Sequence, residues 1–108
     1  MNNKPNALVV QTSITSLTEA KKLAHLLLES KACACVQAIP KITSLFHWNN
    51  NIQSETEVLM LIKTISSQFS NIKKIISKHH PYDVPEIIAL PISNISDEYY
   101  SWINNTCK

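Results

Sequence analysis

Side chains that can bind metals or move protons are concentrated in one short stretch. The eight residues from His79 to Glu86 contain two imidazoles, a phenol and two carboxylates. His79 and His80 are candidate ligands for a divalent transition metal, and among these ions copper(II) binds imidazole nitrogen most tightly. Neighbouring side chains on a helix point about 100° apart, so the two rings do not easily chelate one ion. The alternative is a helix end that carries two imidazoles and no metal.

Two prolines fix where this stretch lies in the fold. Pro81 and Pro85 exclude the residues before them from helical geometry, so the chain must become extended here. An amphipathic helical pattern precedes them, with Ser66 or Ser67 as its predicted cap. The predicted inward face of this helix consists of Phe69, Ile72, Ile75, Ile76 and His79. A strand over residues 86–92 follows, so the imidazoles lie at a helix–strand junction.

A second set of polar residues belongs to the most apolar predicted strand. Alternation places Glu57 and Lys63 on one face, on either side of two leucines. Together with Trp48, Tyr82 and Glu86 they are predicted to form a polar interface between subunits. The alternative is a pocket at the subunit boundary, in which Lys63 and Tyr82 hold an anionic effector. No nucleophile with an adjacent base is apparent, so the sequence predicts no enzyme activity.

The remaining pattern predicts the elements that position these residues. Ser16 and Glu19 form a capping box that begins a first helix. Pro40 should bend or bulge a long strand, and the triplet of asparagines after Trp48 should close a hairpin. The predicted order is a central strand over residues 7–12, a helix from 16, strands over 33–48 and 54–65, a second helix, a strand over 86–92 and a helix from 96.

This order predicts an α+β fold of the ferredoxin-like type, βαββαβ with an extra C-terminal helix. One antiparallel sheet with helices on one face is expected, in a single domain that spans residues 1–108. The long bent hairpin exceeds what a four-stranded sheet of this size requires. Because exposed strand edges are a liability in a monomer, the hairpin predicts an oligomer.

Composition narrows the classes of function. All ten basic residues are lysine, which argues against a nucleic-acid binder and against an acylphosphatase-like enzyme that would need arginine for the phosphate. The absence of glycine excludes Gly-rich phosphate loops and leaves the turns to Asn, Ser, Asp and Pro. No apolar run approaches the length of a membrane span, and residues 1–6 lack the apolar core of a signal peptide. A cytoplasmic protein that does not bind membranes is predicted.

The three cysteines suit a reducing compartment better than a disulfide framework. Cys33 and Cys35 are predicted to share one face of a strand. A Cys-x-Cys metal clip is the alternative, but no second pair of thiols with zinc spacing follows it. Buried strand cysteines are therefore the favoured interpretation.

Several short motifs in a fixed order resemble the CutA divalent-cation-tolerance family over residues 7–102. The most specific is the segment His80-Pro81-Tyr82-Asp83-Val84-Pro85-Glu86-Ile87-Ile88. The other matching pieces are residues 34–36, 39–40, 43–48, 57–58, 62–64 and 100–102.

The resemblance implies a trimer of ferredoxin-like subunits whose long hairpins pair between subunits. It also implies a cytoplasmic protein that serves tolerance of copper and other divalent metals, with no established catalytic reaction. In similar bacterial members the two histidines that open the HHPY motif are assigned as copper ligands, which carries that role to His79 and His80. Copper or another divalent metal is thus the implied ligand, not required for folding, and further copies of the chain are the implied partners.

The chain departs from the family pattern at three places. The third assigned ligand is a cysteine at the end of the first strand, where this chain has Thr12, whose hydroxyl is a poor ligand for soft metals. The usual Trp-x-Gly hairpin tip reads Trp48-Asn49-Asn50, and Phe46 replaces a tyrosine. Two functions stay open: a metal-tolerance trimer with weak histidine-based copper binding or, as the alternative, a trimeric signalling module that binds a small anionic effector between subunits.

Overall fold

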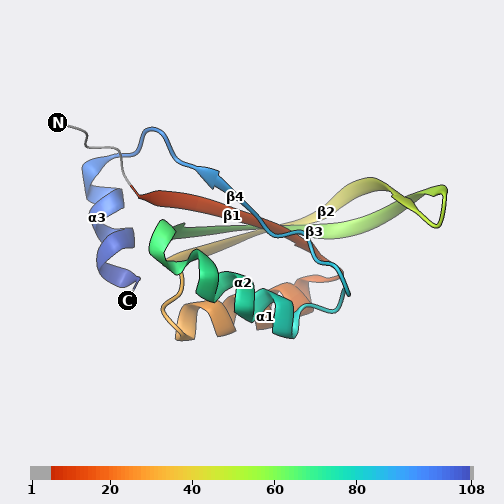
Figure 1. Cartoon of the computed structure of the whole chain (residues 1–108), viewed down its shortest axis with the longest axis horizontal. Coiled ribbons are helices and arrows are strands. Elements are labelled where there is room, and N and C mark those ends of the chain that lie inside the picture. The colour runs from red at the N-terminus through yellow and green to blue at the C-terminus, as the bar shows by residue number, and fades with distance from the viewer. Residues whose placement is uncertain (1–5, 108) are drawn as a thin grey trace.

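The computed structural model describes residues 6–107 and shows the predicted alternation of strands and helices (Figure 1). Most of the N-terminal stretch that argued against a signal peptide lies outside the described residues. The elements are β1 (Ala7–Ile14), α1 (Leu17–Glu29), β2 (Cys35–Trp48), β3 (Asn51–Ile65), a short 3-10 turn (Ser66–Gln68), α2 (Phe69–His79), β4 (Ile88–Pro91) and α3 (Asp97–Thr106).

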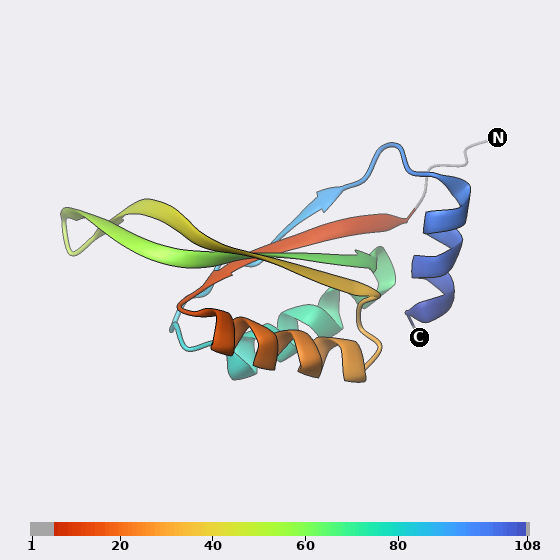
Figure 2. The ribbon, with the colours of Figure 1, turned by 180° about the vertical axis from the view of Figure 1, so that it is seen from behind.

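The four strands form one antiparallel sheet in the order β2-β3-β1-β4, which confirms the predicted ferredoxin-like α+β fold. β1 is central, as predicted, because it pairs with β3 on one side and β4 on the other. Helices α1 and α2 lie together on one face of the sheet, whereas α3 stands at the end where β1 begins (Figures 1 and 2). The opposite face of the sheet carries no helix among the described residues.

The core lies between the sheet and the two helices on its covered face. Alternate residues of β1 and β3 point into it, which is why those positions are apolar. The main contributors are Val10, Ile14, Met60 and Ile62 from the sheet and Leu23, Leu27, Ile72 and Ile76 from the helices. A smaller cluster, Ala34, Ile65, Ile103 and Cys107, attaches α3 to the end of the sheet.

Helix starts were predicted with mixed success. The Ser16 hydroxyl accepts a hydrogen bond from the Glu19 amide at 3.2 Å, which confirms the cap of α1. Ser96 caps α3 in the same way through the Tyr99 amide. The predicted serine cap of α2 is wrong. The Ser66 amide still donates to the carbonyl of Asn6, so the chain makes a 3-10 turn before α2 begins.

β2 and β3 continue beyond the body of the molecule as a two-stranded arm, here defined as residues 42–57 (Figure 1). The arm begins at a bulge between Ile39 and Ile42, which confirms the irregularity predicted at Pro40. It ends in a two-residue turn in which Asn49 and Asn50 have φ of 52° and 63°. This confirms the prediction that asparagines, which tolerate positive φ, close the hairpin in place of the usual glycine.

Three further expectations need correction. Lysine also takes positive φ: Lys31, at 61°, ends α1 in a Schellman motif, and Lys41, at 62°, forms the bulge. Cys33 precedes β2 instead of lying in it, so it does not share a strand face with Cys35. β4 is shorter than predicted, and Glu86 lies in the loop before it.

No helix among residues 6–107 is both long and apolar enough to cross a membrane.

Candidate functional site

The end of α2 separates the two adjacent histidines. His79 is the last helical residue and is exposed, although the helical pattern predicted that it would point inward. His80 precedes Pro81 and therefore adopts extended backbone geometry, with ψ of 139°. This geometry turns its ring toward β1, where only 8% of the residue is exposed. The predicted pair thus consists of one accessible imidazole and one buried imidazole.

Both ring nitrogens of His80 already have hydrogen-bond partners. Nε2 lies 2.8 Å from the carbonyl oxygen of Ser13, and a carbonyl oxygen can only accept. Nδ1 lies 3.1 Å from the backbone nitrogen of Tyr82, which can only donate. These partners assign the ring proton to Nε2 and leave Nδ1 as an acceptor. The ring also packs at a tilt against Tyr82, with 4.8 Å between centroids.

Tyr82 connects this ring to the arm. Its hydroxyl donates to Oε2 of Glu57 at 2.5 Å, and Glu57 is only 6% exposed. Burial, followed by the hydrogen bond to Glu57, raises the pKa of Tyr82 well above its ordinary value of 10.0. The structure therefore brings together two of the residues predicted for the polar interface, although they lie in separate elements.

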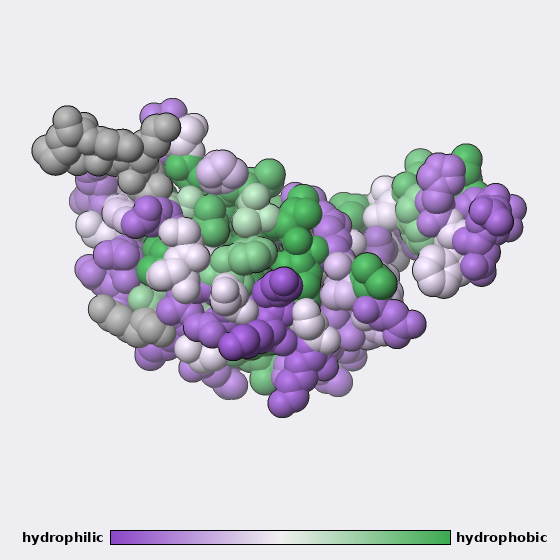
Figure 3. All heavy atoms as spheres, viewed as in Figure 1, coloured by the Kyte–Doolittle hydropathy of each residue, from purple (hydrophilic) through white to green (hydrophobic). Residues whose placement is uncertain are grey.

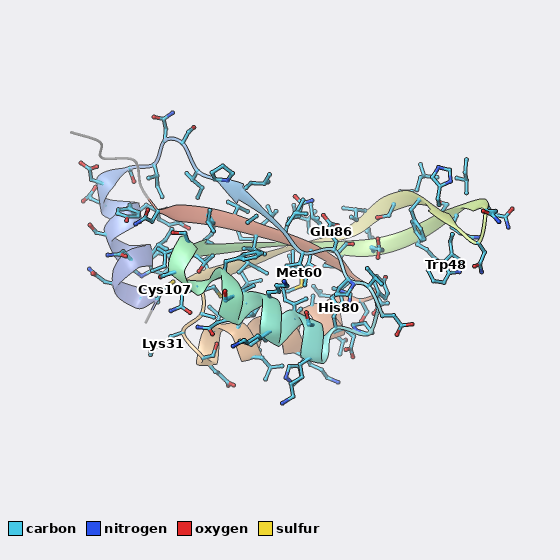
Figure 4. All side chains as sticks on the ribbon, viewed as in Figure 1. Lys31, Trp48, Met60, His80, Glu86 and Cys107 are labelled. Atoms are coloured by element: carbon cyan, nitrogen blue, oxygen red, sulfur yellow. The ribbon has the colours of Figure 1, made fainter. Side chains whose placement is uncertain are left out.

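Glu86 joins the same region from the loop before β4. Its carboxylate accepts from the Gln11 side-chain amide at 2.8 Å and from the Ser13 hydroxyl at 3.4 Å. Ser13 thus serves two residues at once, because its carbonyl accepts from His80 while its hydroxyl donates to Glu86. Figure 4 shows His80 and Glu86 near the point where the arm leaves the body.

A groove of about 1180 Å³ runs between the arm and the segment around Tyr82. Four carboxylates line it, those of Glu55, Glu57, Asp83 and Glu86, and no lysine among the described residues does so. Trp48 belongs to the lining but lies far out along the arm (Figure 4). The excess of carboxylates makes this groove unfavourable for an anionic effector, at least within one chain.

Lys63 lies elsewhere. It is six residues from Glu57 along β3, which corresponds to roughly 20 Å. Its ammonium donates to Oε1 of Gln37 at 2.7 Å and lies 5.7 Å from the centre of the Tyr99 ring, near α3. A pocket that combines Lys63 with Tyr82 therefore does not form within one chain. Such a pocket between subunits stays a prediction.

The predicted metal ligands do not converge. Among residues 6–107, no group of three His, Cys, Asp or Glu side chains is arranged to hold a metal ion. Thr12, at the position of the family's cysteine, is 0% exposed, and its hydroxyl has no hydrogen-bond partner within the described part of the chain. With His80 engaged at both nitrogens, the His79–His80 chelate does not fit this chain.

The thiols do not replace this site. Cys33 is buried and Cys35 is only half-buried, and they lie in different local structures. Burial raises the pKa of the Cys33 thiol to about 12, and the neighbouring Cys107 and Cys35 add to the effect. Because the thiolate is the form that binds metals, Cys33 is a poor ligand here. The Cys-x-Cys clip, the less favoured interpretation of the sequence, is not supported.

Sequence reasoning missed Gln11 and Ser13. Ser13 is 67 residues from His80 and 73 from Glu86, so only the fold brings these groups together. Both residues lie on β1 with side chains on the face opposite the core. Polar residues at alternate positions of a central strand were the only available signal, and they also suit an ordinary solvent-facing surface.

Comparison with known proteins identifies the family. The family model described as "CutA1 divalent ion tolerance protein" matches residues 8–106. The chain belongs to the CutA1 family. The chloroplastic CutA protein of Arabidopsis thaliana is 37% identical over 94% of this chain and 56% of its own length. The CutA protein of Thermus thermophilus is also 37% identical, over 88% of this chain and 92% of its own length.

A solved structure confirms the CutA architecture. The periplasmic divalent cation tolerance protein CutA of Archaeoglobus fulgidus superposes with a TM-score of 0.92 at 35% identity. The match covers 94% of this chain and 99% of that one. The chain therefore spans nearly all of these bacterial and archaeal relatives, but little more than half of the Arabidopsis protein.

Proposed function

We propose that this CutA protein serves divalent-cation tolerance as a homotrimer, with weak copper(II) binding through the exposed imidazole of His79. The observation that carries the proposal is the family match over residues 8–106, together with relatives named divalent-cation tolerance proteins. No catalytic step is part of the proposal. Tolerance would follow from binding of the cation, or from a response to it.

The arm supports assembly from several copies. Trp48 is 61% exposed and Ile52 is 72% exposed, and Leu45 also faces solvent. Figure 3 shows the arm as a separate lobe on which hydrophobic residues lie among hydrophilic ones. β1 stops at Ile14, opposite Val58, and the described residues supply no further strand along that edge of the arm. Exposed apolar groups beside a free strand edge favour pairing with another copy.

The alternative of a module for a small anionic effector receives less support. It requires a cationic group in the groove, and no lysine among residues 6–107 joins the carboxylates of Glu57 and Glu86 there. We therefore place cation tolerance first.

We also propose that the protein is cytoplasmic. Cys33, Cys35 and Cys107 are free thiols in this structure, and free thiols suit a reducing compartment. The Arabidopsis relative has a chloroplastic name and the Archaeoglobus relative a periplasmic name, so the names do not tie the family to one compartment.

His79 suits a weak copper contact. Its imidazole is exposed in the last turn of α2, where the helix dipole favours positive charge. Imidazole nitrogen is a preferred ligand of copper(II), and a single ring supplies only one of the ligands that the ion needs. The binding is therefore expected to be weak.

The test is a calorimetric copper(II) titration of the wild-type protein, His79→Ala and His25→Ala. His25 is the matched control, because it is an exposed helical histidine outside the motif. We expect wild type and His25→Ala to bind alike and His79→Ala to bind at least several-fold more weakly. Binding that is equal in all three proteins, or absent from wild type, would rule out the histidine part of the proposal.

A further inference from the structure

We infer that His80 is a positioning residue that fastens the loop of residues 81–86 to β1 and holds Tyr82 against Glu57, and that it is not a metal ligand. The inference concerns the buried member of the histidine pair. It is independent of whether His79 binds copper.

Both ring nitrogens of His80 are already engaged in hydrogen bonds. A metal binds a neutral imidazole through the lone pair of the nitrogen that carries no proton. In His80 this nitrogen is Nδ1, and its lone pair accepts the Tyr82 amide. Binding through Nε2 would instead move the proton and break the contact with the Ser13 carbonyl. Either route leaves a partly buried backbone group without its partner.

The His80 ring also holds the start of the loop of residues 81–86 in place. The His80 amide closes α2 by donating to the Ile76 carbonyl, and Pro81 has no amide hydrogen. The Tyr82 amide is therefore the next donor along the chain, and the His80 ring accepts it. This is the geometry of an Asx turn, with an imidazole in place of the asparagine oxygen. The ring thus sets the direction of the loop as it leaves the helix.

The loop of residues 81–86 is attached to the rest of the molecule near both of its ends. Tyr82 binds Glu57 of the arm, and Glu86 binds Gln11 and Ser13 of β1, whereas Asp83 and Val84 between them are exposed. Ser13 contacts both His80 and Glu86, so one residue of β1 anchors the two ends of the loop. Loss of the His80 contacts should release Tyr82 first, because it is the next attachment point.

The experiment compares His80→Asn and His80→Ala with wild type. An asparagine oxygen can accept the amide two residues on, but the asparagine side chain lacks the ring nitrogen that copper(II) prefers. Hydrogen exchange of the Tyr82 amide measures how well the loop is held, and copper(II) calorimetry measures the affinity for the metal. Nitrogen NMR of the His80 ring shows which ring nitrogen carries the proton.

We expect the Tyr82 amide to stay protected in His80→Asn and to exchange at least tenfold faster in His80→Ala. Both variants should keep the copper affinity of wild type, and the ring proton should be on Nε2. The inference is overturned if His80→Asn keeps its protection but loses copper affinity, if His80→Ala protects Tyr82 as well as wild type does, or if the proton is on Nδ1. If wild type binds no copper, the histidine part of the proposed function fails, and exchange and tautomer still decide the role of His80.

Discussion

Strand β3 passes through two environments: one half is covered by helices of the same chain, and the other half is exposed in the arm. From Val58 onward, alternate residues of β3 are buried beneath α1 and α2. Before Val58, the strand belongs to the arm, where most side chains face solvent. The backbone is extended and paired with β2 in both halves. Both halves are therefore equally regular as strands, but only the half before Val58 has no helices packed against it.

This difference shows that pairing alone does not anchor the arm. A two-stranded hairpin is marginally stable in water without a third strand or a packed face. Glu57 and Tyr82 lie at the border between the halves and tie the base of the arm to the loop of residues 81–86. Beyond that point most side chains of the arm face solvent, and in the proposed trimer other copies of the chain would cover them.

The largest expected effect compares the same substitution in the two halves. Ile62→Ala removes a side chain that is fully buried and should lower the free energy of unfolding by about 2–5 kcal/mol. Ile52→Ala in the arm should change the intrinsic stability by less than about 0.5 kcal/mol and instead weaken association. Denaturant unfolding measures the first effect, and sedimentation at low protein concentration measures the second. Unchanged association in Ile52→Ala would show that this part of the arm is not covered.

At the border, Tyr82→Phe should lower the free energy of unfolding by about 1–2 kcal/mol, because a buried carboxylate loses its donor. Tyr100→Phe is the matched control, since the hydroxyl of Tyr100 accepts a long hydrogen bond, of 3.5 Å, from the Asn6 amide. Denaturant unfolding at neutral pH should show a clearly smaller loss for the control. Equal losses would contradict a special role for the Glu57 contact.

The raised pKa of Tyr82 also predicts a pH dependence. The folded protein holds this proton to higher pH than the unfolded chain does. The contribution to stability is therefore complete below about pH 10, the pKa of unfolded tyrosine, and is lost as the pH rises toward the folded-state value. Wild type should lose stability over this range more steeply than Tyr82→Phe. If the stability of both proteins fell equally with pH, the pH dependence would not come from the raised pKa of Tyr82.

Within the body, Thr12 and Thr64 offer a matched pair of buried hydroxyls. The hydroxyl of Thr12 finds no hydrogen-bond partner among residues 6–107, so Thr12→Val should raise the free energy of unfolding by about 1 kcal/mol. The hydroxyl of Thr64 donates to the Ala32 carbonyl at 2.6 Å, so Thr64→Val should lower it by a similar amount. Thermal unfolding of both variants measures the difference. Changes of the same sign would contradict the assignment of these hydrogen bonds.

The smallest expected effect lies at the bulge where the arm leaves the body. Lys41 has φ of 62°, a region that costs residues with a Cβ atom more than glycine. Lys41→Gly should therefore stabilise the protein by up to about 1 kcal/mol. Asn50→Gly, at φ of 63°, should gain less because asparagine tolerates this region. A larger gain at Asn50 in thermal unfolding would argue against this account of the bulge.

Features set by neighbouring residues could be predicted from the sequence. The cap at Ser16, the bulge after Ile39 and the asparagine turn at the tip each follow from residues a few positions apart. The order of these elements, with the apolar pattern of each, was enough to predict the sheet and its central strand.

Features that depend on distant residues could not be predicted in this way. His79 and His80 differ because Pro81 turns only the second ring toward Ser13 on β1. Glu57 and Lys63 share a face of β3, yet one contacts the loop of residues 81–86 and the other contacts Gln37. The alternation of residues along a strand predicts which face a side chain is on, but not which other residues it contacts there. The lysines at positive φ were missed because their position is fixed by the helix end and the bulge, not by their own preference.

The most direct test of the account is the mass of the wild-type protein by sedimentation equilibrium from micromolar to nanomolar concentration. If the arm is completed by other copies of the chain, the mass should be three times that of one chain at micromolar concentration. A single-chain mass at micromolar concentration would contradict the account, because the exposed apolar residues of the arm would then have no partner copy to cover them.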